Sequence, residues 1–256
     1  MANVGIIMRR ELRSYFATPL AYVFILIFLV LANLFAFKFG NLYERGQADL
    51  QPFFWFHPWL YLFLIPALSM RLWAEERKSG SIELLMTLPV TLWQAVLGKY
   101  FAAWIFTAIA LALTFPIWIT VNYLGSPDNG VIFATYIGSL LLAGGFLAFG
   151  SCMSALTRNQ VIAFILAVVV CFILLLAGYP AVLDWASGAL HWLLGWLLPQ
   201  SFVDGIVDAI ASLSFQRHFD SISKGVIDIR DLLYFAMLIG LFLLATAITL
   251  DVRKAD

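Results

Sequence analysis

The residues that could perform catalysis are few and far apart in the chain. Three histidines occur, His57, His191 and His218, without the H-E-x-x-H spacing that places two zinc ligands on one helix face. We expect each of them at an interface or in a loop. Ser151 follows a glycine in an apolar run, but no histidine in the last apolar run could activate it as a nucleophile. We therefore expect no catalytic residue and no metal site.

ATP hydrolysis also requires a second polypeptide. No G-x-x-x-x-G-K-[ST] phosphate loop occurs in the sequence, so the chain cannot hydrolyse ATP by P-loop chemistry and is not expected to be an enzyme or to bind a cofactor itself. Any ATP-driven step would need ATP and Mg²⁺ in a partner subunit.

The composition is that of a membrane protein. Hydrophobic residues make up 63% of the 256 residues, charged residues make up 12%, and the mean hydropathy is +0.94, whereas soluble domains are about 25% charged. The formal net charge is zero, which gives no reason to expect a nucleic-acid partner. We predict an all-α membrane protein with one transmembrane domain over residues 1–256, in an inner membrane.

Apolar runs of about 20 residues can cross the ~30 Å hydrocarbon core as helices. The stretches without charge predict six spans, at about 19–38, 57–75, 92–123, 131–156, 160–183 and 231–251. Residues 184–229 would form an external segment with short helices. Within it, the run 185–203 contains serine, glycine, histidine and proline, so we favour an interfacial or re-entrant helix there over a seventh span.

Lysine and arginine set the orientation, because they accumulate on the cytoplasmic side. Six spans place ten basic residues on the amino-terminal side and five on the opposite side. We therefore predict a multi-pass protein with both termini in the cytoplasm. Residues 2–18 form a basic amphipathic segment that would lie on the cytoplasmic leaflet as an elbow helix, with Arg9, Arg10 and Arg13 among anionic headgroups. Alternatively, these arginines only set the topology.

The stretch between the second and third spans is the most informative part of the sequence. Gly80 would end the charged helix that continues from the second span, Ser81 can cap a new helix, and Glu83 falls in its first turn. We predict a short cytoplasmic helix over 81–89, ended by Pro89. The T-x-x-Q sequence that begins at Thr91 is a capping box for the next span. Apolar residues on this short helix favour a docking surface over a solvated turn.

This stretch resembles the permeases of the type-2 ABC exporter family. It reads E-R-K-S-G-S-I-E-L-L-M-T-L-P-V over residues 76–90, close to the pattern E-R/K-x-x-G-S/T-x-E-x-L-x-x-x-P-V. Stretches at 10–22 and 218–231 are similar to the gliding-motility-associated branch of that family. The resemblance implies that 81–89 is a coupling helix that fits a groove of a nucleotide-binding subunit. Its coupling residues would be Glu75, Glu76, Arg77, Gly80, Ser81, Glu83, Leu84, Leu85, Pro89 and Val90.

The resemblance also implies partners. These are two copies of an ABC ATPase subunit, a second permease chain in a homodimer or with a close relative, the lipid bilayer, and an auxiliary membrane-anchored protein with an external domain. The implied function is coupling of ATP hydrolysis in the partner to substrate export. Two alternatives stay open: a non-transporting transmitter that relays ATPase motion to an external partner through 184–229, and a channel or secondary carrier that works without an ATPase.

Overall fold

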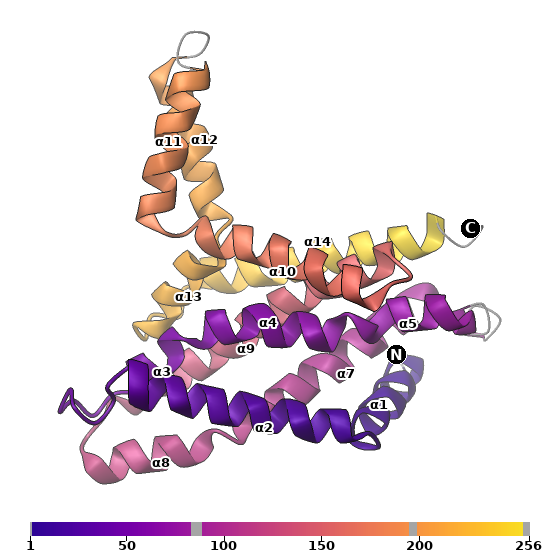
Figure 1. Cartoon of the computed structure of the whole chain (residues 1–256), viewed down its shortest axis with the longest axis horizontal. Helices are drawn as coiled ribbons and strands as arrows, with labels where there is room; N and C mark the ends of the chain where they lie inside the picture. Colours follow the sequence, from indigo (N-terminus) through magenta and orange to yellow (C-terminus); the bar gives the residue numbers. More distant parts are fainter. Residues whose placement is uncertain (1, 83–88, 195–198, 253–256) are drawn as a thin grey trace.

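The computed structural model describes residues 2–82, 89–194 and 199–252, and the regular elements in these ranges are all helical (Figure 1). The prediction of an all-α fold is therefore confirmed. The helices are α1 (Ala2–Phe16), α2 (Pro19–Leu34), the π-helical turn η1 (Phe35–Phe39), α3 (Gln51–Trp55), α4 (His57–Ser69), α5 (Arg71–Ser79), α7 (Leu92–Ala112), α8 (Phe115–Leu124), α9 (Asn129–Leu156), α10 (Gln160–Leu176), α11 (Pro180–Leu194), α12 (Gln200–Ser212), α13 (Phe215–Ser223) and α14 (Ile229–Val252).

Four helical stretches are long and apolar enough to cross a membrane: Pro19–Phe39, Leu92–Leu124, Asn129–Leu156 and Ile229–Val252. A fifth is obtained only if Gln160–Leu176 and Pro180–Trp192 are taken together, and these two are bent by 89°. The stretch predicted as the second span is divided at Met70 between α4 and α5. By length and composition, the described part of the chain thus has four or five spans, and the count of six stays a prediction.

Helix starts follow local sequence signals closely. Pro19 occupies the first turn of α2, where its missing amide hydrogen is not needed. At the start of α7, the side chain of Thr91 accepts from the amide of Gln94, and the side chain of Gln94 accepts from the amide of Thr91. The predicted capping box is therefore confirmed.

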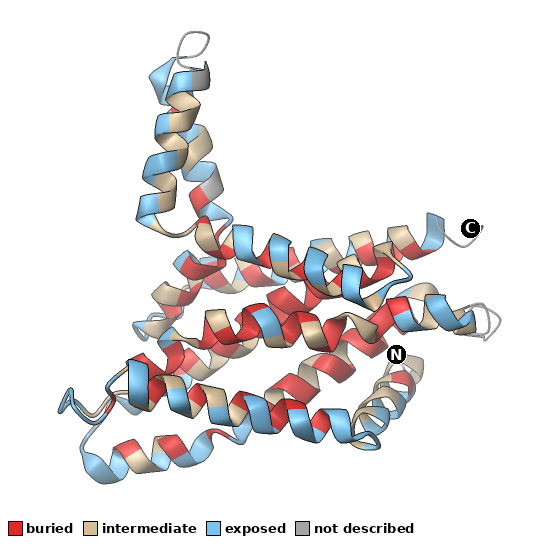
Figure 2. Cartoon of the chain, viewed as in Figure 1, coloured by how far each residue is buried: buried red, intermediate tan, exposed pale blue. Residues whose placement is uncertain are grey.

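Helix α9 lies at the centre of the bundle and packs against α4, α5, α7, α10, α13 and α14. Figure 2 shows it buried along most of its length. Glycines make these contacts close. A Cβ atom added at Gly145 would lie 2.8 Å from the ring of Phe215, and one at Gly150 would strike the hydroxyl of Ser69 and lie 2.6 Å from its Cβ atom. These small residues let neighbouring backbones approach α9.

The two ends of the bundle are distinct. The amino terminus, the end of α5 at Gly80 and the last turn of α14 lie together, and we call this the Gly80 end (Figure 1). The loop around Gly46, α3 and the start of α9 lie at the opposite end, which we call the Gly46 end. The geometry therefore groups the elements that we predicted for each side of the membrane.

The external segment differs in detail from the prediction. The span predicted at 160–183 ends as a helix at Leu176, because Gly178 and Pro180 follow and the chain turns sharply into α11. In place of one interfacial helix over 185–203, α11 and α12 form a hairpin that projects from the side of the bundle (Figure 1). The Nε2 atom of His191 on α11 lies 3.2 Å from Oδ1 of Asp204 on α12.

The close contact at Gly150 generates a stability prediction. Gly150→Ala should lower the apparent melting temperature of the purified protein, since overpacking a filled interface costs about 1–3 kcal/mol. Adding Ser69→Gly should restore much of the loss by removing the atoms that the new methyl group meets. Gly240→Ala on α14 is the matched control, because a Cβ atom there meets nothing within 4 Å. Thermal loss of the monodisperse size-exclusion peak measures all four proteins, and equal melting temperatures for Gly150→Ala and Gly240→Ala would contradict the packing described.

Candidate functional site

Helix α5, which leads to the predicted coupling segment, is tied to α9 by one hydroxyl group. The Oγ atom of Ser154 accepts hydrogen bonds from the amides of Trp73 and Ala74, both at 3.1 Å, and donates to the carbonyl of Met70 at 2.8 Å. These are the backbone groups that the break between α4 and α5 would leave without partners. Ser154 therefore makes the break stable where water is scarce.

Two further bonds extend this attachment along α5. The indole Nε1 of Trp73, which is fully buried, donates to Oγ of Ser151 at 3.1 Å. One turn later, Nη1 of Arg77 donates to the carbonyl of Ala155 at 2.7 Å, near the last turn of α9. Helix α5 is thus fixed to α9 through both its backbone and its side chains, and the two helices are constrained to move together.

A buried lysine joins α5 to two other helices. The Nζ atom of Lys99 on α7 lies 2.7 Å from Oε1 of Glu76 on α5 and 3.7 Å from Oε2 of Glu11 on α1. It also lies 5.2 Å from the ring centroid of Trp73, within cation–π range. Lys99 is 4% exposed. Because buried charges are strongly destabilising unless paired, this cluster of Glu11, Lys99 and Glu76 constrains three helices at one point.

The cluster carries an excess of negative charge. Around Lys99 it contains two carboxylates and one ammonium group, and the exposed Arg10 also pairs with Glu11, at 2.8 Å, so Glu76 is the carboxylate that depends on Lys99. Oε2 of Glu76 is buried with no hydrogen-bond partner among the described residues. An acceptor left without a partner in this way carries an unrecovered desolvation cost. A displacement at the end of α5 is therefore expected to change the electrostatic energy of the contact between α1, α5 and α7.

Helix α1 packs closely on the start of α7. A Cβ atom added at Gly98 would lie 2.7 Å from the side chain of Ile7, and Nδ2 of Asn3 donates to Oε1 of Gln94 at 3.2 Å. The three arginines predicted for the membrane surface, Arg9, Arg10 and Arg13, are exposed on the same helix. Helix α1 therefore presents one face to α7 and a basic face away from it.

The residues predicted to couple to an ATPase are only partly brought together. Glu76 and Arg77 point into the bundle, whereas Glu75 is exposed and pairs with Arg71 at 3.0 Å. Gly80 has a φ of +73°, the left-handed conformation that ends α5 as the sequence indicated. Ser81 is half-buried, with its Oγ 2.9 Å from that of Ser79. On the far side of the loop, Pro89 is exposed and Val90 is half-buried; Glu83, Leu84 and Leu85 lie outside the described residues.

A family model described as "ABC-2 family transporter protein" matches residues 28–253, which is most of the chain. The match includes α5, Glu76 and Lys99, but not α1 with Glu11. The chain belongs to the ABC-2 transporter family. It is therefore the membrane permease component of an ABC transporter, a multi-pass membrane protein that associates with an ABC ATPase subunit. No match was found among curated proteins.

Two members of the cluster in this ABC-2 permease were not predicted from the sequence. Glu11 was not singled out, and Lys99 was counted only among the ten basic residues that set the orientation. A signal was nevertheless present, because Lys99 lies inside the predicted span 92–123 and a lysine at such a position needs a partner. Its partners come from residues 11 and 76, which only the tertiary structure brings together.

A small cavity of about 270 Å³ opens beside the cluster in the permease. Its lining includes Glu11, Tyr15, Arg71, Glu75 and Lys99. Burial raises the pKa of the Tyr15 hydroxyl, and the nearby Glu11 raises it further, so Tyr15 stays neutral. The cluster thus borders a cavity with several charged lining residues at the Gly80 end.

The three histidines of the permease have separate structural positions. His57 was expected in a loop or at an interface, which is wrong: it begins α4, is fully buried, and its Nδ1 lies 2.8 Å from Oγ of Ser139 on α9. His218 on α13 lies 2.6 Å from Asp231 on α14. Among the described residues, no group of three potential ligands could hold a metal ion.

The Lys99 cluster generates the second prediction. Lys99→Met should destabilise the permease by about 3 kcal/mol, because it leaves Glu76 in a poorly solvated site without a counter-charge, whereas Glu11 keeps its pair with Arg10. Adding Glu76→Gln should recover part of this loss. Lys78→Met changes an exposed lysine on α5 and serves as the control. Thermal unfolding in detergent measures the difference; a Lys99→Met protein as stable as Lys78→Met would show that the ion pairs contribute nothing.

Proposed function

We propose that this permease exports a substrate across a bacterial inner membrane by coupling to ATP hydrolysis in two separate nucleotide-binding subunits, which hold ATP and Mg²⁺. The observation that carries the proposal is the attachment of α5. This helix leads directly into the segment 81–89, and it is fastened to α9 by Ser154 and to α1 and α7 by Lys99. A force applied after Gly80 thus passes through α5 to α9, α1 and α7.

The mechanism needs an ATPase that contacts two states of the permease differently, because a partner shifts a conformational equilibrium only by its differential affinity. When the two ATPase subunits close on ATP, the segment 81–89 moves with them. Helix α5 is short and rigidly attached, so it transfers that displacement to α9 and, through Glu76 and Lys99, to α7 and α1. The permease then favours a conformation open to the opposite face.

The distribution of charge supports a cytoplasmic position for the Gly80 end. Most basic side chains of the described residues gather there: Arg9, Arg10, Arg13, Arg71, Arg77, Lys78, Lys99 and Arg158. This arrangement follows the positive-inside rule. We infer that both termini are cytoplasmic, that α1 is an elbow helix on the inner leaflet, and that α4 with α5 and α10 complete six spans.

The surface of the bundle supports pairing with a second permease chain. Helices α2, α10 and α14 carry many exposed apolar side chains, including Leu26, Ile173 and Met237. Lipid covers such a surface, and part of it is available to a second copy in a homodimer or to a close relative. We infer from the similarity of residues 10–22 and 218–231 that the permease belongs to the gliding-motility-associated branch.

One observation favours the alternative function of a transmitter. The hairpin α11–α12 projects from the bundle, and Trp185 and Trp192 on it are 76% and 83% exposed. An auxiliary membrane-anchored protein with an external domain could bind this hairpin and receive motion from the ATPase. The hairpin projects from the bundle, so it can be removed to test the two functions separately.

The third prediction concerns Gly80. Gly80→Val should reduce co-purification of the ATPase and ATPase stimulation by about tenfold, since a β-branched residue in the left-handed region costs about 1–2 kcal/mol and redirects the chain after α5. Gly80→Asn should retain function, because asparagine tolerates this conformation. The control is Gly46→Val, with a φ of +62° and equally open surroundings at the other end. Normal assembly and stimulation for Gly80→Val would refute the proposed coupling segment.

The fourth prediction separates export from transmission. Gly178 lies against Ser214, so the two ends of the hairpin are adjacent and a short Gly/Ser linker can replace residues 181–212. An exporter without the hairpin should keep its ATPase partner and basal substrate flux in proteoliposomes. Loss of an external partner together with unchanged ATPase stimulation would instead favour the transmitter.

A further inference from the structure

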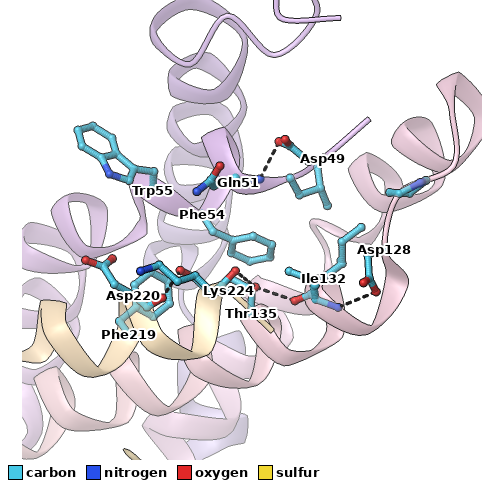
Figure 3. A pocket seen from close by; sticks show the side chains of 14 residues that line it. Asp49, Gln51, Phe54, Trp55, Asp128, Ile132, Thr135, Phe219, Asp220 and Lys224 are labelled. Carbon is cyan, nitrogen blue, oxygen red and sulfur yellow. Dashed lines mark hydrogen bonds between the residues drawn. The ribbon is translucent and has the colours of Figure 1, made fainter. Parts of the chain in front are cut away.

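A second cavity, of about 560 Å³, lies at the Gly46 end of the bundle (Figure 3). Its walls come from α3, the start of α9 and the last turn of α13. The apolar part of the lining contains Phe54, Trp55, Ile132 and Phe219. This volume is within the roughly 300–1,000 Å³ typical of small-molecule sites, and the apolar walls can hold the apolar part of a ligand.

The polar lining is unusually rich in charge. Asp49, Asp128, Asp220 and Lys224 all border the cavity, which gives three carboxylates and one ammonium group. Asp49 already pairs with Arg45, at 3.9 Å, outside the lining. Figure 3 shows these residues on different sides of the same space. A ligand with a single negative charge would be attracted to Lys224 alone, whereas a ligand that also carries a positive charge would be attracted to the carboxylates.

The protein holds these carboxylates in place without satisfying them. Oδ1 of Asp128 accepts from the amides of Gly130 and Val131, at 2.9 and 3.2 Å. Oδ1 of Asp220 accepts from Nε2 of Gln216 at 2.8 Å. Among the described residues, no hydrogen-bond or ion-pair partner occupies the second oxygen of either carboxylate. Each group is therefore oriented through one oxygen and has the other available to a donor.

Asp220 also has a buried polar neighbour. Gln216 is 5% exposed, and its Oε1 atom has no hydrogen-bond partner among the described residues. Burial raises the pKa of the Asp220 carboxyl, while the hydrogen bond from Gln216 and the nearby Lys224 act in the opposite direction. The ionised carboxylate is thus poorly solvated, and a bound cation would stabilise it.

We propose that this cavity binds the headgroup of a zwitterionic phospholipid, with its primary ammonium group at Asp220 and its phosphate at Lys224. The ammonium group supplies donors to the available oxygen of the Asp220 carboxylate. The apolar walls and the position at one end of the membrane-spanning bundle match a lipid better than a soluble zwitterion. Binding requires neither ATP nor movement of the segment after Gly80, so it is independent of the proposed coupling.

The test measures lipid retention by native mass spectrometry. The full-length permease, purified with its ATPase, is exchanged into detergent with equal amounts of phosphatidylethanolamine and phosphatidylglycerol that carry the same acyl chains. The wild-type protein should retain phosphatidylethanolamine over phosphatidylglycerol by roughly tenfold. The variant Asp220→Asn keeps the shape of the side chain and an oxygen that can accept from Gln216, but it should lose this preference. Asp208→Asn, on the exposed face of α12, is the matched control and should keep it.

Three results would overturn the proposal. The first is equal retention of both lipids by the wild-type protein, which needs no variant to fold. The second is an unchanged preference in the Asp220→Asn protein when its size-exclusion profile is normal. The third is displacement of the retained lipid by millimolar O-phosphoethanolamine, which would assign the cavity to a soluble zwitterion. None of these results affects the Gly80 experiment, so the lipid site and the coupling segment succeed or fail separately.

Discussion

The rest of the structure depends on how α9 satisfies the interrupted backbone of its neighbour. Where α4 ends and α5 begins, backbone groups are released that hydrocarbon cannot hydrogen-bond. Ser154 supplies one acceptor and one donor for three of them. The glycines of α9 bring adjacent helices close enough for such short side chains to reach. The central helix α9 therefore stabilises the break in the second predicted span. The positions of α5 and α9 thus depend on each other.

The attachment of α5 to α9 makes the Gly80 end of the bundle rigid. Helix α5 is a nine-residue helix that cannot tilt without breaking bonds to α9 or separating Glu76 from Lys99. The Lys99 cluster is partly unsatisfied, because Glu76 retains a buried oxygen without a hydrogen-bond partner among the described residues. A rigid attachment next to an under-satisfied charge cluster is suited to convert a small displacement after Gly80 into rearrangement of α1 and α7. Membership of the ABC-2 family supplies the partner that would produce it.

Local signals in the sequence were sufficient for features that depend on a few neighbouring residues. The first turn at Pro19, the capping box of Thr91 and Gln94, and the left-handed Gly80 each follow from backbone chemistry. Gly178 and Pro180 are local signals for the end of α10 and Lys99 is visible inside a predicted span, but the 89° angle, the helical hairpin and the partners of Lys99 could not be predicted, because they depend on contacts between distant segments. Apolar runs give the number of residues available for a span, but they carry no information on where a remote serine or carboxylate will interrupt or join helices.

The proposed mechanism requires that the ATPase binds the segment after Gly80 at the cytoplasmic face. Site-specific photo-crosslinking tests it most directly, with a photoreactive amino acid at Ser81 and, as a reference, at Gln47 in the opposite loop of the assembled transporter in cells. The account predicts a covalent product with the ATPase from position 81 and none from position 47. A product from position 47, or its absence at 81 in a complex that hydrolyses ATP normally, would contradict the account.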